Sequence, residues 1–462
     1  MSDFAKLLQK VPMICSSTID YYRYGPPQPS WNLKFYLMYK LIKDGMASSS
    51  SQTIENIQGT YNTKTAIDND IFVDELILSN SLRKRSEIYI DDVLKDYNHV
   101  LLDDWRIILY LHGGAYFVYP PGYRSSTSRI AKSTNARLFV INYRLAPQNQ
   151  FPAALHDSIT AYNYLINPPN DADFLPIEPK NIIIMGDSAG GGLTMATLLA
   201  IRDSKKSLPS PAGAVLWSAW VDLVHSTPSA KDPKFEETDF LTRKNFNCAI
   251  SPAWEEFEQK AEELSEKIRL NVDNKPRFWH KSFDCDGRLQ LYVSNEGLAI
   301  PYVSPLFAES LGGLPPILVQ VGDVERLRDE GIYLAHKAAN PEKYNLPNYN
   351  AEKFERSSYK TPTKVVLEVY EEMPHVFHLL LNLHSSPNMA VKRTAEFIEQ
   401  LLSGKEKKQE LEVLRVTSKG KIIEELKEEH YKILECENIG VVSSNIEKDY
   451  CTRPNDDNDN KL

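Results

Sequence analysis

The sequence has few cysteines and no long apolar run, and both shortages exclude classes of protein. Its cysteines, at positions 15, 248, 285, 436 and 451, are odd in number and far apart, so neither a disulfide framework nor a metal-binding cysteine pair is expected. This cysteine usage fits a reducing compartment. The chain has no run of about 18 apolar residues, and its first residues lack a basic segment followed by an apolar core. We therefore expect no transmembrane span, no signal peptide and a cytoplasmic location.

An excess of positive charge is also missing. The net charge is −9 and the isoelectric point is about 5.7, which argues against a nucleic-acid partner. With 462 residues, of which 42% are hydrophobic and 25% charged, the chain suits one large α/β domain with insertions, or two domains.

A serine stands between two glycines where an apolar segment meets a helix-forming one. Residues 181–185 are apolar and β-branched, which predicts a buried strand, and residues 193–201 favour a helix. Between them lies Gly186-Asp187-Ser188-Ala189-Gly190. This arrangement exposes a serine hydroxyl on a tight turn beside a base. We predict that Ser188 is a nucleophile; a serine that only caps the helix is the alternative.

A second glycine motif follows the apolar residues 106–111 and reads His112-Gly113-Gly114-Ala115. Two glycines after a strand can direct backbone N–H groups to one point. Acyl transfer needs such donors for its oxyanion, and each is typically worth about 3 kcal/mol. A simple turn at the end of a strand is the alternative, but the two motifs in this order favour acyl transfer.

The motifs together resemble the hormone-sensitive-lipase-like branch of the α/β-hydrolase family, over residues 85 to 400 or so. The matching stretches are residues 112–115, 143–147, 151–154, 186–191, 220–222, 327–331 and 375–377. The resemblance implies an α/β-hydrolase fold with a helical cap and the hydrolysis of esters. It points to short- to medium-chain acyl or lipid-like esters, steryl acetates among them. The oxyanion donors would be the N–H groups of Gly113, Gly114 and Ala189, and neither a metal nor an organic cofactor is expected.

Alternating strand and helix patterns predict the same fold from the residues alone. Most strand candidates are continuous apolar runs, as parallel strands covered on both faces should be, and helical patterns such as 153–166 and 328–338 separate them. We predict a doubly wound, mostly parallel sheet. Its strands are expected at residues 87–90, 106–111, 137–142, 181–185, 213–218, 316–321 and 364–369.

Two acids after the strand predicted at 316–321 are candidates for the third member of a catalytic triad. A triad needs one carboxylate to orient the histidine and to offset the imidazolium charge. Aligning residues 327–331 on the family motif places Glu325 at the acid, where the family commonly has Asp followed by Pro. Asp323 is the alternative acid. Asp329 and Glu330 are expected to be solvated charges.

A histidine follows the strand predicted at 364–369. His375 stands in the loop where the base of an α/β-hydrolase belongs, with His378 as the alternative. The chain order Ser188, Glu325, His375 is the one expected for this fold.

Three further segments surround the core, which is expected to span residues 85–403. Residues 1–60 predict a helical arm, and the resemblance implies that this arm contributes to the cap. Its apolar helix at 31–42 is expected to pack on the core or across the active-site mouth, with contact to a membrane or lipid surface as the alternative. Residues 224–300 predict a cap insertion with an amphipathic helix after Ser251. Its apolar stripe either packs on the core or lines an acyl pocket, and consists of Trp254, Phe257, Ala261, Leu264 and Ile268. Residues 404–462 predict a charged tail, helical and solvated at 405–434 and disordered at 455–462.

We therefore expect a carboxylic ester hydrolase whose partner is a small-molecule ester, peripheral to a membrane or lipid droplet in one alternative. Two other functions stay open at this point. One is a catalytically silent ligand-binding protein on the same fold, and the other is an amidase or deacetylase with the same triad. Residue patterns leave the natural substrate and the oligomeric state open.

Overall fold

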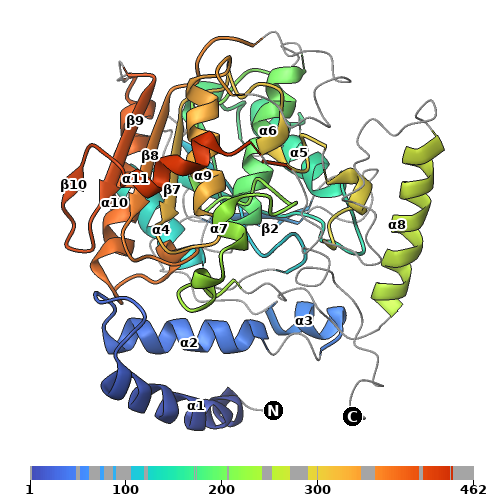
Figure 1. The fold of residues 1–462 in the computed structure, drawn as a ribbon. Coiled ribbons are helices and arrows are strands. Elements are labelled where there is room, and N and C mark those ends of the chain that lie inside the picture. Colours follow the sequence, from blue (N-terminus) through green and yellow to red (C-terminus); the bar gives the residue numbers. More distant parts are fainter. Residues whose placement is uncertain are drawn as a thin grey trace.

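A central sheet and the helices around it make up most of the described chain (Figure 1). The computed structural model describes residues 3–47, 52–61, 73–77, 87–89, 106–118, 123–204, 208–241, 252–270, 290–344, 359–404 and 409–440, apart from positions 171, 173, 299 and 438. The strands are β1 (Val73–Ile77), β2 (Glu87–Tyr89), β3 (Ile107–Leu111), β4 (Arg137–Asn142), β5 (Ile182–Asp187), β6 (Gly213–Trp217), β7 (Ile317–Gly322), β8 (Val365–Tyr370), β9 (Leu411–Val416) and β10 (Ile422–Ile423). The helices are α1 (Asp3–Tyr24), α2 (Leu33–Ala47), α3 (Ile54–Tyr61), α4 (Tyr123–Thr134), α5 (Ala153–Ile166), α6 (Ala189–Asp203), α7 (Pro228–Lys231), α8 (Pro252–Leu270), α9 (Arg328–Ala339), α10 (Ser385–Leu402) and α11 (Glu428–Tyr431).

The described strands form one sheet in the order β10-β9-β8-β7-β6-β5-β3-β4-β1-β2. Only the two outermost pairs, β1 with β2 and β9 with β10, are antiparallel. Each of the seven predicted strands is present, with its ends within two residues of the prediction. The predicted doubly wound, mostly parallel sheet is therefore confirmed.

Apolar side chains cover both faces of this sheet because successive residues of a strand point to opposite sides. Ile182 and Ile184 of β5 face a large core shared with α5, α6 and α9. Ile183 and Met185 face a second core with α4 and α10. The continuous apolar runs that predicted parallel strands follow from this two-sided burial.

The N-terminal helices lie along one side of the molecule, where α2 packs on the core and α1 packs on α2 (Figure 1). Trp31, Phe35 and Tyr39 bury themselves against the loop that follows β8. Gln58 of α3 donates hydrogen bonds to the carbonyl oxygens of Phe117 and Ala146. The helix predicted at 31–42 therefore packs on the core with its inner face.

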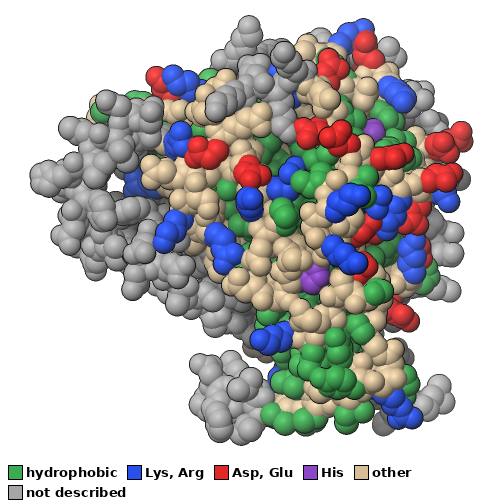
Figure 2. All heavy atoms as spheres, turned by 90° about the vertical axis from the view of Figure 1, so that its left-hand side faces the viewer, with side chains coloured by type: hydrophobic (Ala, Val, Ile, Leu, Met, Phe, Trp, Pro, Cys, Tyr) green, Lys and Arg blue, Asp and Glu red, His purple; other side chains and the backbone are tan. Residues whose placement is uncertain are grey.

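The outer face of these helices is apolar as well. Figure 2 shows hydrophobic side chains gathered on the lower projection of the molecule, which α1 and α2 form. The exposed apolar residues there are Val11, Ile19, Tyr22, Tyr24 and Met38. Among the described helices, none combines the length and the hydropathy that a membrane crossing requires.

Helix α8 is the longest described helix of the predicted cap insertion, and it stands apart from the sheet beside α3 (Figure 1). Three members of its predicted apolar stripe, Trp254, Phe257 and Ala261, are buried. The side chains of the other two, Leu264 and Ile268, lie outside the described residues.

The C-terminal segment corrects the sequence-based prediction. Residues 405–434 were expected to form a solvated helix beyond a core ending near 403, but β9 pairs in parallel with β8 and extends the central sheet. Gly420, at φ 78°, lies in the turn that leads to β10, and α11 follows. Backbone N–H and C=O groups at the edge of β8 gain partners this way, which outweighs the local helical charge pattern. The segment 455–462 lies outside the described residues.

Candidate active site

Five neighbouring strands bring the candidate residues together. In the order β8-β7-β6-β5-β3 all neighbours run parallel, so their carboxyl ends meet at one edge of the sheet. Ligand and active sites in open α/β sheets lie at this edge. The residues that follow these strands are His375, Glu325, Ser218, Ser188 and Gly113.

Ser188 occupies a sharp turn between β5 and α6. Its backbone angles are φ 51° and ψ −122°, a combination that non-glycine residues seldom adopt. Glycines make the turn possible: a Cβ at Gly186 would lie 2.3 Å from the carbonyl oxygen of Gly190, and one at Gly190 would lie 1.9 Å from that of Leu111. Strand, turn and helix therefore have the arrangement that the sequence predicted.

His375 lies in the loop after β8, and its Nε2 is 2.9 Å from Oγ of Ser188. The two residues are 187 positions apart in the sequence, and this contact joins their side chains directly. The ring is 3% exposed, and burial lowers the pKa of His375 to about 3. The imidazole is therefore neutral at neutral pH and able to accept a proton from the serine.

Glu325 approaches the other ring nitrogen of His375. Its Oε2 lies 3.9 Å from Nδ1, which is the distance of an ion pair rather than of a hydrogen bond. The same oxygen accepts a hydrogen bond of 2.7 Å from the hydroxyl of Ser218. Burial raises the pKa of Glu325 well above its ordinary value, and the nearby Asp239 raises it further.

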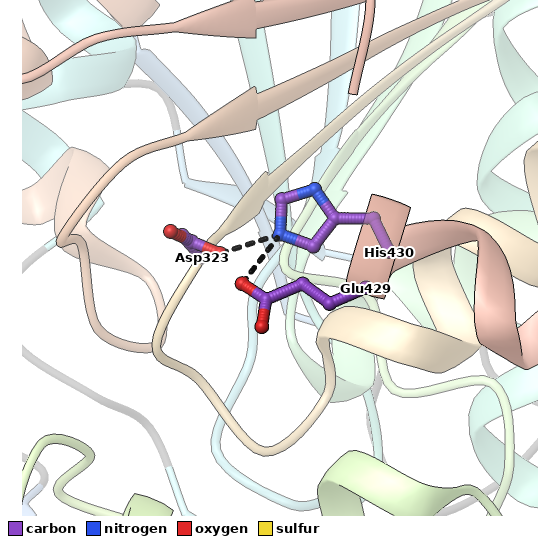
Figure 3. A group of neighbouring side chains, drawn as sticks. All are labelled: Asp323, Glu429 and His430. Atoms are coloured by element: carbon purple, nitrogen blue, oxygen red, sulfur yellow. Dashed lines mark hydrogen bonds and ion pairs between the residues drawn. The ribbon is translucent and has the colours of Figure 1, made fainter. Parts of the chain in front are cut away.

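Asp323, the alternative acid, is bound elsewhere. Its Oδ1 lies 2.6 Å from Nε2 of His430 (Figure 3). Its Oδ2 accepts from Nζ of Lys427, also at 2.6 Å. Burial raises its pKa, but the hydrogen bonds and charges of His430 and Lys427 outweigh burial and hold the pKa of Asp323 below its ordinary value. The structure therefore brings Glu325, and not Asp323, to His375.

Asp323, Glu429 and His430 have ligand atoms within 4.8 Å of one another and form the described side-chain group that resembles a metal site (Figure 3). Two features oppose metal binding there. Lys427 already neutralises Asp323, and Arg328 lies 3.7 Å from its Oδ1. Metal-bound histidines usually donate their second N–H to an acceptor, but Nδ1 of His430 is buried without one among the described residues. These side chains are better explained as ion pairs that hold α11 against the loop after β7.

The glycine turn after β3 gives a mixed result for the predicted oxyanion donors. The N–H of Gly113 donates to Oδ1 of Asp187 at 2.9 Å, and the hydroxyl of Tyr110 donates to the same oxygen. This corrects the prediction for Gly113, because its amide already donates to Asp187 of the serine motif. Gly114 has φ 101° and Ala189 is the first residue of α6, and the amides of these two residues remain the predicted oxyanion donors.

Three other predictions about polar residues come out differently in the structure. Asp329 and Glu330 are not solvated charges, since they are 4% and 0% exposed. Asp329 accepts from the N–H of Ser229 and Glu330 from that of Val221, so both tie α9 to the segment after β6. His378 is stacked on a tryptophan ring with its centroid 4.5 Å away, and its ring nitrogens are buried without partners among the described residues.

Sequence reasoning missed two residues of this site. Ser218 donates to Glu325 and accepts from the N–H of Val376 at 3.0 Å, so it joins the loops of the acid and the base. Its position directly after β6 was a usable signal, because active-site residues follow the strands of such sheets. Asp239 is buried between the same two loops and belongs to no local motif.

A sequence model of the α/β-hydrolase fold family matches residues 108–264 and 245–352, together more than half of the chain. The chain belongs to the α/β-hydrolase family. The predicted resemblance to esterases and lipases of this family is confirmed at that level.

Relatives of this hydrolase include an acetyl-hydrolase of Streptomyces hygroscopicus, 29% identical over 276 residues that make up 60% of this chain and 69% of the relative. An arylesterase of Saccharolobus solfataricus is 26% identical over 53% of this chain and 65% of the arylesterase. A solved esterase from the bacterial hormone-sensitive lipase family has a TM-score of 0.51 at 24% identity, over 80% of this chain and 99% of that one. The solved structure shares the fold with this hydrolase.

Proposed function

We propose that this hydrolase cleaves carboxylic esters by nucleophilic catalysis, with Ser188 as nucleophile, His375 as base and Glu325 as the acid that supports it. The observation that carries the proposal is the 2.9 Å contact between Oγ of Ser188 and Nε2 of His375, at a turn held in a strained conformation. A serine hydroxyl is a weak nucleophile unless a positioned base takes its proton. The named relatives, an acetyl-hydrolase and an arylesterase among them, support the same chemistry.

In the first half of the reaction Oγ of Ser188 attacks the carbonyl carbon while its proton moves to Nε2 of His375. The carbonyl π electrons move onto the oxygen, and we expect the N–H groups of Gly114 and Ala189 to stabilise it. Ala189 supplies a helix N-terminal amide, where the dipole favours negative charge. The intermediate then collapses, the C–O bond to the alcohol breaks, and the alcohol leaves with the proton of His375.

In the second half water repeats the attack on the acyl-enzyme. His375 removes a proton from the water, the oxyanion forms again, and the bond to Oγ breaks as Ser188 regains its proton. Glu325 offsets the positive charge that His375 carries during both halves. At 3.9 Å from Nδ1, its carboxylate needs only a small approach to form a hydrogen bond when the imidazolium appears.

We infer that the acyl group is short to medium in length or lipid-like, with steryl acetates as candidate substrates. The activities after which two relatives are named support small acyl groups: one is an acetyl-hydrolase and another an ethyl acetate hydrolase of Pseudomonas putida. A catalytically silent binding protein is the less favoured function, because Ser188 and His375 are in contact. An amidase or deacetylase would use the same geometry and needs a direct test.

The test treats the purified protein with a fluorophosphonate and measures the intact mass beside Ser188→Ala. We expect one adduct on the unaltered protein and none on the variant, because only an activated serine reacts this way. Turnover of p-nitrophenyl esters of increasing chain length then defines the acyl pocket, and matched anilides separate an esterase from an amidase. No adduct and no turnover of any ester would leave the binding protein as the explanation.

We also propose that α1 and α2 contact a lipid surface, which the sequence left open as the alternative for this arm. Ile19 and Tyr22 are 62% and 75% exposed and lie on the outer face of α1. Burying such a side chain in a lipid interface contributes about 1.5–3 kcal/mol, and aromatic residues favour that depth.

Co-sedimentation with phosphatidylcholine vesicles checks this contact. Ile19→Glu is expected to weaken binding by about tenfold or more, since it removes one buried apolar side chain and adds a charge. Leu175→Glu is the matched control: Leu175 is 80% exposed but lies in the loop after α5, and its replacement should leave binding unchanged. Equal binding of the two variants to the vesicles would show that α1 does not contact the lipid.

A further inference from the structure

Asp239 is a buried carboxylate in the segment before α8, and it contacts both loops of the candidate triad. Its Oδ2 accepts from the N–H of Arg326 at 2.7 Å, next to Glu325. Its Oδ1 accepts from the N–H of His375 at 3.2 Å. The side chain is 0% exposed, so these hydrogen bonds form without competition from water.

We propose that Asp239 is a positioning residue for the reaction described above, on which this inference rests. By accepting one backbone N–H from the acid loop and one from the base loop, it sets the separation between Glu325 and His375. Ser218 makes the second connection, from the side chain of Glu325 to the N–H of Val376. The two connections form a closed frame around the acid and the base.

A strained backbone conformation next to His375 explains why these connections are needed. Val376, directly after His375, has φ 45°, a left-handed conformation that is unfavourable for a β-branched residue. Such a conformation persists only where the surroundings hold it. Hydrogen bonds to the N–H groups of both His375 and Val376 supply that restraint, and they keep Nε2 directed at Ser188.

The chemical type of Asp239 fits the role. An ionised carboxylate only accepts hydrogen bonds, so it can serve the N–H groups of His375, Arg326 and, at 3.4 Å, Leu241 together. An asparagine at this position has one acceptor oxygen and would turn an NH₂ donor toward one of these N–H groups. Asn is therefore nearly equal in volume but unable to complete the frame.

The placement of this carboxylate has an electrostatic cost. Its charge raises the pKa of Glu325, that is, it disfavours the ionised form of the acid. Natural proteins keep such local conflicts mainly at functional sites.

The N-terminal arm and the cap segment hold Asp239 in place from outside. The hydroxyl of Tyr39 on α2 donates to the carbonyl oxygen of Glu237 at 2.6 Å and lies 3.3 Å from that of Asp239. The guanidinium of Arg326 reaches Glu236 at 2.7 Å. Helix α2 is thus connected through residues 236–239 to the two catalytic loops.

The experiment compares Asp239→Asn with Asp222→Asn. Asp222 is also 0% exposed and also accepts backbone N–H groups, from Val224 and Ser226, but it contacts neither catalytic loop. For Asp239→Asn we expect kcat to fall by about 10²-fold, the usual cost of displacing catalytic groups by about 1 Å, with KM nearly unchanged. Labelling by the fluorophosphonate should slow in parallel. Asp222→Asn should lower the melting temperature comparably and keep kcat within about threefold.

An unchanged kcat in Asp239→Asn, or equal losses of kcat in both variants, would overturn the proposal. If Asp239→Asn does not fold, Tyr39→Phe decides the matter, because it removes only the hydroxyl that holds residues 237–239. A lower kcat at constant KM in that variant supports the frame, and wild-type kcat contradicts it. Absence of ester turnover in the unaltered protein would instead refute the proposed function itself.

Discussion

Replacing Glu325 by Gln tests which acid supports His375. The change keeps the size of the side chain and removes its charge, so the imidazolium formed during acyl transfer loses its counter-ion. At the observed 3.9 Å, two unit charges attract each other by about 4 kcal/mol at an effective dielectric constant of about 20. Since 1.36 kcal/mol corresponds to tenfold in rate, we expect kcat/KM to fall by about 10³-fold.

The assay measures kcat and KM with a p-nitrophenyl ester for Glu325→Gln, Glu330→Gln and Asp323→Asn. Glu330→Gln is the matched control, because Glu330 is equally buried and burial likewise raises its pKa, but it accepts from Val221 and not from the triad. It should retain activity within a few-fold.

Asp323→Asn should keep most of the activity but lose stability. It removes the charged partner of Lys427 and His430, and hydrogen bonds to charged groups are typically worth about 2 kcal/mol. The reasoning fails if Asp323→Asn abolishes turnover in a folded protein while Glu325→Gln stays active.

Two further predictions concern the turn at Ser188 and the base His375. Gly190→Ala should prevent folding or lower the melting temperature drastically, because its Cβ would lie 1.9 Å from the backbone of Leu111; Gly404→Ala, at φ 69° with nothing within 4 Å, should cost only about 1–2 kcal/mol. A thermal scan of both variants decides, and equal stability would contradict the steric argument. Because burial lowers the pKa of His375 to about 3, the acidic limb of kcat/KM should lie below the ordinary histidine value of about 6.5. The unfolded chain takes up this proton first, so His375 makes the fold less stable as pH falls from about 6.5 towards 3, by up to about 1.4 kcal/mol per pH unit; a limb above pH 6.5 would refute this account.

Much of the fold was predictable because its signals are local. Runs of apolar residues reveal strands that are buried on both faces. The glycines around Ser188 are required because a Cβ at Gly186 or Gly190 would lie less than 3 Å from neighbouring backbone atoms. The seven predicted strands rest on such signals. Strand β9 was not predictable in this way, because residues 411–416 form a strand only through pairing with β8, while the surrounding Lys and Glu residues favour a solvated helix.

The sequence favoured Glu325 as the acid but left Asp323 open as the alternative, because the two acids are two residues apart after the same strand. Their difference comes from distant partners: His430 and Lys427 bind one, and His375 and Ser218 face the other. The same holds for Gly113, whose amide is bound by Asp187, a residue of the other motif.

The amino-acid sequence by itself determined the features that depend on a few neighbouring residues. These are the strands, the turn at Ser188 and the chemical types of nucleophile, base and acid. Tertiary structure decided which acid faces the base, which amides stay available and where the C-terminal segment goes. These outcomes depend on hydrogen bonds and charges between residues far apart along the chain, and such contacts exist only once the strands have been ordered in the sheet.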